Sequence, residues 1–548
     1  MTTAYAPTVG PGEIVPFASA RYAEKTALVC GATRLTYHEL DECSRAVAAA
    51  LQQRGVGVGD VVSIYGQNGW QWIVAYHGIL QAGAVVNPLN VMLTAPELAH
   101  VLRDCRACGL FAGPGQVEVA ASVVGDLPGL DLFAVLDDVE SAGAAAFWSL
   151  LTEGRGRRLT PVMHGPRDLC SIGYTSGTTG HPKGAMQSHQ AVLLNCALTA
   201  TMHGRTERDT VVTALPAAHV YGNVAINSMF LAGGTVVLMD RFDPATALDL
   251  IGAEQATMFE GVPAMYSMML ADPAIETADL SSLRVSTVGG QTFSIDVLDR
   301  WQRRTNAQLI ELWGMTELAG LGSTHSVYAP ACPGSIGVGL PGVELGIEPI
   351  DGSAGPVPTG SHGELVVRGP LVMLGYLGQP DATAEVLTPD GWLRTGDVAY
   401  ADDTGHFYVV DRLKDMIITA GYNVYPAEIE RVVAAHPDVA VAAVGRRADP
   451  VRGEIAVAYV VPKPGREPSV NSIIDHCRDR LAAYKRPRDV VFVDHLPATS
   501  SGKLMRRALA ELDQAAQATC IVKIGANTPK LVMAEDEVTQ SSAPEASI

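Results

Sequence analysis

The chain is short of positive charge, and it has no long apolar run. Its 548 residues carry 39 Lys and Arg against 58 Asp and Glu, which gives a formal net charge of −19. Non-specific nucleic-acid binding needs a basic surface, so this balance argues against a nucleic acid as partner. No apolar stretch approaches the roughly 20 residues of a membrane-spanning helix. The first residues, Met1-Thr-Thr-Ala-Tyr-Ala-Pro, lack a basic region followed by an apolar run, so no signal peptide is predicted.

Cysteines are few and scattered. The chain has nine, an odd number, and Cys105 and Cys108 form the only C-x-x-C pair. With no second pair to complete a zinc site, we expect buried free thiols. Free thiols suit a reducing compartment, so the predicted location is the cytoplasm.

Length and periodicity indicate several domains of the α/β class. A chain of this length is too long for one compact core. Thr36 and Thr94 each begin a capping box, which predicts helices that start directly after them. Strands alternating with helices predict a largely parallel sheet with crossover connections. The other elements expected in the first third are strands at 61–65 and 84–86 and a helix from Trp70 to Gly83.

Two later regions have a different character. Residues 330–400 are rich in Gly and Pro with short alternating runs, which predicts a small antiparallel or barrel-like subdomain. Residues 337–342 match G-x-G-x-x-G, but no strand-to-helix unit surrounds them, so we interpret them as turns. From about residue 412 the pattern becomes α+β. Its expected elements are a helix after Pro426, strands at 439–444 and 455–461, and a helix from about 471.

A hydroxyl- and glycine-rich loop at residues 174–184, which reads YTSGTTGHPKG, is the most informative stretch. Its hydroxyls can donate to phosphate oxygens, its glycines allow close backbone approach, and its lysine adds a mobile cation. It is not a Walker A motif, because Pro182 stands where that motif has its second glycine. Such composition also occurs in plain turns, but the full string is far more specific. The residues expected to bind phosphate are Thr175, Ser176, Gly177, Thr178, Thr179, Gly180 and Lys183.

This loop resembles the phosphate loop of the adenylate-forming superfamily, which includes acyl-CoA synthetases, aryl-CoA ligases, luciferases and peptide-synthetase adenylation domains. Further segments resemble other motifs of the superfamily, in the family's order. They are the aromatic-G-x-T-E segment at 311–317, the ribose-binding segment at 391–397, the hinge at 411–415 with the loop at 421–430, and the lysine segment at 501–503. The resemblance covers about residues 174 to 503.

The resemblance implies a domain organisation. A large N-terminal AMP-binding domain is expected at residues 1–411, with parallel α/β sheets and the small barrel-like subdomain. A small, mobile α+β C-terminal domain is expected at 412–515, with its hinge near Lys414. Composition drifts after about residue 515, and residues 534–548 carry Glu, Asp, Ser, Gln and Pro with few large apolar groups, so we expect a disordered tail at 516–548.

The resemblance also implies a two-step reaction with ATP, CoA and Mg²⁺. A carboxylate first attacks the α-phosphorus of ATP and expels pyrophosphate, and the CoA thiol then attacks the acyl-adenylate and expels AMP. Thr316 is expected at the α-phosphate, and Glu317 and Thr178 at Mg²⁺, which prefers hard oxygen ligands. Asp397 and Arg412 are expected at the ribose. The adenine slot is expected at Gly289, Gly290, Trp313 and Gly314.

The remaining site residues follow from the same resemblance. Lys503 is expected to bridge the substrate carboxylate and the α-phosphate, and Gly421 to form the pantetheine channel. His219 matches the family's P-x-x-H-x-x-G histidine, which we interpret as positioning or gating the acyl group and not as a general base. The candidates for the acyl pocket are small or apolar: Tyr221, Gly222, Val224, Ala225, Met315, Gly320 and Leu321. Taken singly, Thr316, Glu317, Asp397, Lys503 and His219 also have structural readings as caps, turns or surface groups.

The substrate is predicted to be an apolar medium-chain fatty acid or aryl acid. Members that activate amino acids place an aspartate near the acyl carboxylate, and residues 216–226 contain none. Three other functions stay open: loading of a carrier protein in trans, an oxygenase of luciferase type, and a non-catalytic acyl or nucleotide sensor. A homodimer is one assembly compatible with the sequence.

Overall fold

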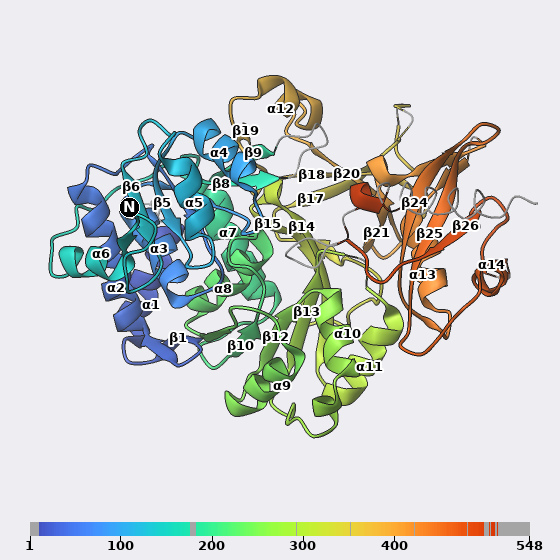
Figure 1. Cartoon of the computed structure of the whole chain (residues 1–548), viewed down its shortest axis with the longest axis horizontal. Coiled ribbons are helices and arrows are strands. Elements are labelled where there is room, and N and C mark those ends of the chain that lie inside the picture. The colour runs from blue at the N-terminus through green and yellow to red at the C-terminus, as the bar shows by residue number, and fades with distance from the viewer. Residues whose placement is uncertain are drawn as a thin grey trace, which may run out of the picture.

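The fold was taken from a computed structural model (Figure 1), which describes residues 10–175, 182–291, 293–350, 352–353, 355–420, 422–478, 480–497, 504, 506–509 and 512. The phosphate-loop residues Ser176, Gly177, Thr178, Thr179 and Gly180 lie outside the described residues. So do Gly421, Lys503 and the whole of the predicted tail at 516–548.

Two large mixed sheets form the N-terminal part of the chain. In each, five parallel strand pairs lie together, and antiparallel pairs extend the sheet at its edges. The nine-stranded sheet has the order β16 (Val338–Gly339), β15 (Gly320–Thr324), β14 (Gln308–Met315), β13 (Val285–Gly289), β12 (Met258–Gly261), β10 (Thr210–Thr213), β11 (Thr235–Leu238), β1 (Thr26–Cys30), β2 (Thr33–Thr36). The eight-stranded sheet has the order β19 (Gly375–Tyr376), β9 (Lys183–Ser188), β8 (Leu169–Thr175), β4 (Val85–Pro88), β3 (Val61–Tyr65), β5 (Ala107–Ala112), β6 (Leu132–Val135), β7 (Ala145–Ala146). The predicted parallel α/β class is confirmed.

The helices predicted after Thr36 and Thr94 begin where the sequence places them. Thr36 and Thr94 each form a complete capping box, in which the carboxylates of Glu39 and Glu97 accept hydrogen bonds from the cap backbone N–H groups. These reciprocal bonds satisfy backbone donors that the first turn of a helix leaves free. The helices are α1 (Ile14–Tyr22), α2 (Tyr37–Gln53), α3 (Trp70–Gln81), α4 (Ala95–Asp104), α5 (Val117–Val124), α6 (Phe147–Gly154), α7 (His189–Met202), α8 (Val220–Ala232), α9 (Pro244–Ala253), α10 (Pro263–Ala271), α11 (Ile295–Thr305) and α12 (Pro380–Val386).

The glycine- and proline-rich region forms a small antiparallel sheet in the order β17 (Glu344–Glu348), β18 (Gly363–Arg368), β20 (Leu393–Ala401), β21 (Phe407–Arg412). The predicted antiparallel pairing is confirmed, and the four strands form an open row. Residues 337–342, which we interpret from the sequence as turns, form the short strand β16 followed by a turn.

The C-terminal part is the predicted α+β unit. Figure 1 shows it in orange and red, beyond the small sheet as seen from the rest of the chain. Its own apolar core includes Ile417, Ile429, Val444 and Val460. Its elements are the strands β23 (Tyr422–Val424), β22 (Ile417–Thr419), β25 (Gly453–Pro462), β24 (Val439–Asp449) and β26 (Asp489–Phe492), and the helices α13 (Pro426–Ala434) and α14 (Val470–Arg478).

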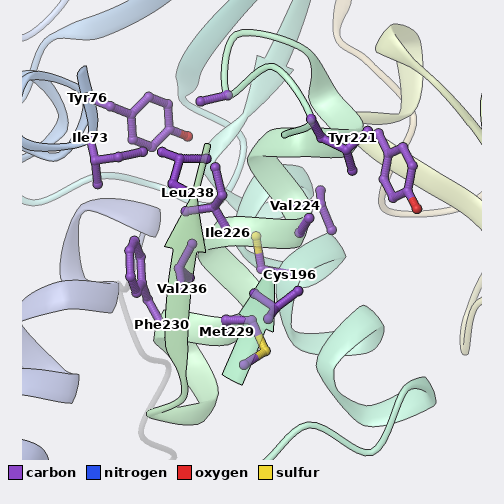
Figure 2. Close-up of a cluster of buried hydrophobic side chains, with 14 of the residues drawn as sticks. Ile73, Tyr76, Cys196, Tyr221, Val224, Ile226, Met229, Phe230, Val236 and Leu238 are labelled. Atoms are coloured by element: carbon purple, nitrogen blue, oxygen red, sulfur yellow. The ribbon is translucent and has the colours of Figure 1, made fainter. Parts of the chain in front are cut away.

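Helix α8 lies at the centre of the main core. Figure 2 shows its side chains packed between α3, α7 and β11. Val224, Ile226 and Met229 are at most 1% exposed. Burial of this kind stabilises by about 1.5–3 kcal/mol per large apolar side chain. Among the described residues, no helix has both the length and the apolar character to cross a membrane.

Candidate active site

The aromatic-G-x-T-E segment lies where β14 ends and the 3-10 helix η3 (Thr316–Leu318) begins. β14 forms a tight antiparallel hairpin with β15. A Cβ atom at Gly314 would overlap the carbonyl oxygen of Gly320, so only glycine allows the two backbones to lie this close. Gly314 is exposed on its other side. The hairpin therefore presents bare backbone to solvent directly beside Trp313.

A buried carboxylate beside this hairpin joins the predicted ribose residues. Asp397 on β20 and Arg412 on β21 are direct partners in the strand register. The Arg412 Nε lies 2.6 Å from Oδ1 of Asp397, and the indole Nε1 of Trp313 donates to Oδ2 at 2.8 Å. Each carboxylate oxygen has two lone pairs, so both can accept one further bond. The structure thus brings together three residues that the sequence assigned to one nucleoside.

The turn after β13 lies next to β14, the strand that contains Trp313. Gly289 ends β13 and pairs with Leu312 of β14, and Gly290 follows with φ of 90°. Beside Gly290 the nearest described atom to an added Cβ is Cγ1 of Val262, at 3.9 Å. A Cβ atom at Gly290 would therefore meet no close contact among the described residues, and the positive φ is what favours glycine there.

The two described ends of the phosphate loop are neighbours. Thr175 ends β8 and Lys183 begins β9, and the two are direct partners in the antiparallel register. Of the residues between them, 176–181 lie outside the described part of the chain. The hairpin nevertheless fixes where the loop leaves and returns.

Helix η3 is tied to this hairpin. The Gln187 side chain on β9 donates to the carbonyl of Thr316 at 2.8 Å, and Cγ2 of Thr316 lies against Gly173 of β8. The Met373 N–H donates to the carbonyl of Glu317 at 2.8 Å. Thr316 and Glu317 are therefore held at the root of the phosphate loop by contacts from different strands.

His219 caps the N-terminus of helix α8. Its Nδ1 accepts from the Tyr221 backbone N–H at 3.3 Å, and its ring is exposed. Tyr221 is buried, and its hydroxyl lies 2.7 Å from Oγ1 of Thr287. A capping role and a position at the entrance of a pocket are compatible, because the cap uses only one ring nitrogen.

The predicted acyl-pocket residues lie on α8 and on the β14–β15 hairpin, which pack together. A Cβ atom at Gly320, whose φ is 150°, would lie 2.5 Å from Cγ2 of Val224 and 2.7 Å from Oδ1 of Asn195. Asn195 bridges helix α7 to the hairpin through its bonds to the backbone of Leu321, at 2.9 and 3.1 Å. Val224, Ala225 and Leu321 are each 1% exposed, and Met315 is partly exposed.

Gly222 has a different surrounding from the one its predicted role implies. A Cβ atom there would overlap the carbonyl oxygen of Pro216, so the position is filled by backbone. Glycine at 222 therefore permits helix α8 to approach the preceding loop, and a side chain added there would meet that loop first.

Comparison with known proteins agrees with this arrangement. A sequence model of the AMP-binding enzyme family matches residues 17–377, and one of the AMP-binding enzyme C-terminal domain matches residues 428–503. The chain belongs to the adenylate-forming superfamily, among its acyl-CoA and aryl-CoA ligases.

Its relatives are similar over nearly their whole length. A feruloyl-CoA synthase of Amycolatopsis sp is 40% identical over 488 residues, which cover 88% of this chain and 94% of the relative. A long-chain-fatty-acid–CoA ligase of Bacillus subtilis (strain 168) is 32% identical over 525 residues, which cover 91% and 93%. The crystal structure of an anthranilate CoA ligase in complex with anthranoyl-AMP has a TM-score of 0.88, with 28% identity and 94% and 100% coverage. The chain is thus an ATP-dependent, AMP-forming carboxylate–CoA ligase.

In this ligase the predicted hinge residue, Lys414, lies exposed in the 3-10 helix η4 (Leu413–Asp415). Asp411, three residues earlier, is buried and accepts from the Ala427 N–H at the start of α13 at 2.7 Å. Burial raises the pKa of Asp411 to about 6, an effect that Arg506 opposes. The chain just before the hinge is therefore attached to the C-terminal part in this conformation.

Arg506 links the segment after Lys503 to the same region. It forms a bidentate ion pair with Glu430 of α13 and donates to the carbonyl of Val444 at 2.9 Å. Its Nε lies 3.5 Å from Oδ2 of Asp415, next to Lys414. One partly buried guanidinium thus connects the C-terminal segment, α13 and the hinge.

Two side-chain interactions in this ligase were not predicted by any sequence motif. Arg205 and Glu260 form an ion pair whose side chains are 0% and 1% exposed, and Arg205 also donates to the carbonyl of Ala225 at 2.8 Å. On the other side of the site, the hydroxyl of Tyr376 donates to Oε1 of Glu317 at 2.8 Å. Their partners lie 55 and 59 residues away in sequence, and no local pattern reports such pairs.

Proposed function

We propose that the substrate of this ligase is an apolar carboxylic acid, either an aryl acid or a medium-chain fatty acid. The observation that carries the proposal is the joint between α8 and the β14–β15 hairpin, where Val224, Ala225 and Leu321 are apolar and buried. Apolar contact of this kind contributes about 0.8 kcal/mol for each CH₂ that is removed from water. The names of the relatives support both classes, because they include feruloyl-CoA synthase, indoleacetate–CoA ligase and long-chain-fatty-acid–CoA ligase.

We infer that ATP binds across the two large sheets and the small one. In this proposal Asp397 and Arg412 hold the ribose, and Trp313, Gly314, Gly289 and Gly290 surround the adenine. The three-residue contact at Asp397 supports it, because a carboxylate already fixed by two donors is preorganised for further hydrogen bonds.

The loop from Thr175 to Lys183 and the hydroxyl of Thr316 are proposed to hold the phosphates. The described ends of this loop are paired with each other, and helix η3 is bonded to the strand at one of those ends. Glu317 and Thr178 are proposed to hold Mg²⁺, and the buried carboxylate of Glu317 fits an ion that prefers hard oxygen ligands. When bound, Mg²⁺ would neutralise charge on the phosphates.

Acyl transfer is proposed to follow a rotation of the C-terminal domain, residues 412–515, against residues 1–411 about Lys414. Lys503 then serves adenylation, and the loop at Gly421 serves entry of the thiol. His219, exposed at the cap of α8, is proposed to position the acyl carboxylate and to gate the thiol. Negative charge concentrates at the reacting phosphate during adenylation, so the positive charge of Lys503 would stabilise that step.

We further propose a reducing cytoplasmic setting, because the eight cysteines of the described residues are free. A role in fatty-acid metabolism applies if the acid is aliphatic, and a homodimer is a proposal for the assembly.

The test is release of AMP and pyrophosphate with a panel of aryl and aliphatic acids, with and without CoA. We expect both products in the presence of CoA, together with an acyl-CoA thioester, for one group of apolar acids. Carrier loading would be favoured instead if pyrophosphate is released with CoA present but a thioester forms only after a carrier protein is added. ATP binding without release of either product would favour a sensor.

A further inference from the structure

Tyr376 lies between the two charged groups that are proposed to hold the triphosphate and its metal. Its hydroxyl donates to Oε1 of Glu317 at 2.8 Å, and its ring has the Nζ of Lys183 5.3 Å from the ring centroid. Glu317 is 7% exposed, so its carboxylate is a buried charge. Among the described residues, Tyr376 is the only one whose side chain donates a hydrogen bond to that carboxylate.

The position of Tyr376 is set by its strand. It is the partner of Ala185 in the antiparallel pairing of β19 with β9, the strand that begins at Lys183. Its backbone N–H donates to Oγ1 of Thr383 at 2.9 Å. Backbone pairing on one side and a side-chain bond on the other therefore hold the ring at the root of the phosphate loop.

A phenol suits this place because it is a neutral donor. A neutral donor orients one oxygen of the carboxylate and leaves its negative charge available for a cation. A tyrosine hydroxyl has an ordinary pKa of about 10, so it is protonated and able to donate near neutral pH. The second oxygen, Oε2, receives no hydrogen bond from the described residues.

The ring also gives Lys183 a partner that is not an anion. A lysine over an aromatic face is attracted by about 0.5–1 kcal/mol at a partly exposed site, without loss of its charge. A direct Lys183–Glu317 ion pair would instead neutralise both groups before ATP arrives. Within the described part of the chain, no salt bridge joins these two residues.

We propose that Tyr376 is a positioning residue of the metal–triphosphate site. Its hydroxyl presents Glu317 Oε2 to the metal, and its ring keeps the ammonium of Lys183 separate from that carboxylate. The inference rests on the proposed role of Glu317 as a metal ligand. It deepens that role by naming the group that orients the ligand.

The test compares Tyr376→Phe with Tyr408→Phe. Tyr408 also donates to a carboxylate, that of Asp402, at 3.0 Å. Neither Tyr408 nor Asp402 belongs to the proposed site. Mn²⁺ binding is followed by electron paramagnetic resonance with α,β-methylene ATP, which cannot release pyrophosphate. The metal-free affinity for the same analogue and the melting temperature without ligand are measured in parallel.

We expect Tyr376→Phe to raise the Kd for Mn²⁺ by about tenfold or more, as loss of a partner of a metal ligand usually does. Its metal-free affinity for the analogue should match that of the parent protein, because the ring remains, and its melting temperature should fall slightly, because the buried Glu317 carboxylate loses a hydrogen-bond donor. Tyr376→Ala should in addition weaken metal-free binding by about threefold, since Lys183 loses its aromatic partner. Tyr408→Phe should change none of these affinities.

Glu317→Gln separates this inference from the function on which it rests. If Glu317→Gln weakens Mn²⁺ binding and Tyr376→Phe does not, Tyr376 has no positioning role. If neither variant weakens it, Glu317 is not a metal ligand, and both statements fail. An equal loss in Tyr376→Phe and Tyr408→Phe would also overturn the proposal, because the effect would not be local.

Discussion

The indole nitrogen of Trp313 lies 2.8 Å from Oδ2 of Asp397, a residue 84 positions later in the chain. Trp313 belongs to the nine-stranded sheet and Asp397 to the small antiparallel one. One hydrogen bond therefore joins two sheets at the place where the nucleoside is proposed to bind. A shift between the sheets would move the adenine residues relative to the ribose residues.

Trp313→Phe keeps an aromatic ring and removes this donor. A hydrogen bond to a charged group contributes about 1.5–3 kcal/mol, so we expect the KM for ATP to rise by about tenfold or more. Pyrophosphate exchange at varied ATP measures it. Trp301→Phe is the matched control, because it loses the indole bond to Ser286, 3.0 Å long, in the core. That variant should lose thermal stability and keep its KM, and a similar rise in KM in both would contradict the prediction.

Lys503→Ala should slow adenylation by about 10²–10³ and spare thioester formation from supplied acyl-adenylate. The lysine charge is needed while the carboxylate and the α-phosphate are both anionic. Single-turnover rates of the two half-reactions measure this. Lys463→Ala is the control, because Lys463 is exposed and its ammonium donates to the carbonyl of Pro437. Equal losses in both half-reactions of Lys503→Ala would contradict the assignment of Lys503 to the first step.

Lys414→Pro should leave adenylation measurable and sharply slow thioester formation. Proline holds φ near −65° and removes a backbone donor, whereas a hinge residue must change its dihedral angles. Gly421→Leu should act likewise, by filling the thiol channel. The opposite pattern, lost adenylation with intact transfer from supplied adenylate, would mean a protein locked in the second conformation. Full activity in both steps is incompatible with a hinge at Lys414.

The acyl pocket can be tested at Met315, which is partly exposed at the end of β14. Met315→Trp should raise KM most for the longest acids, because it fills volume that shorter acids leave free. Gly222→Ala is the contrasting variant. Its Cβ atom would overlap the carbonyl of Pro216, so we expect a loss of about 1–3 kcal/mol in stability and no selectivity for chain length. An equal effect of Met315→Trp on all acids would place the pocket elsewhere.

Stability should fall between about pH 4.5 and 7 because of Glu311. This carboxyl lines a cavity of about 230 Å³, and burial raises its pKa to about 7. Over that interval the folded chain binds the proton more tightly than the unfolded chain does, so deprotonation destabilises the fold as pH rises. Glu311→Gln, which can still accept from the Gly334 N–H, should remove about 1–3 kcal/mol of this fall. Urea unfolding at pH 5 and pH 8 measures it, and an unchanged difference would contradict the assignment.

The local elements of this protein follow from its sequence. Thr36 and Thr94 mark helix starts because a capping box is complete within four residues. The strand at 61–65 is an apolar run of the length a buried parallel strand needs. The family also follows from the sequence, because its motifs are short and contiguous.

The contacts that assemble the site were decided only by the tertiary structure. Asp397 meets Trp313, Glu317 meets Tyr376, and Arg205 meets Glu260 across 84, 59 and 55 positions. Such pairs depend on strand order and register, and neither is encoded in the residues that make the contact. Gly222 shows the same limit of sequence analysis at a predicted pocket residue. Its identity predicts free space, and only the packed loop around Pro216 reveals that backbone already occupies that space.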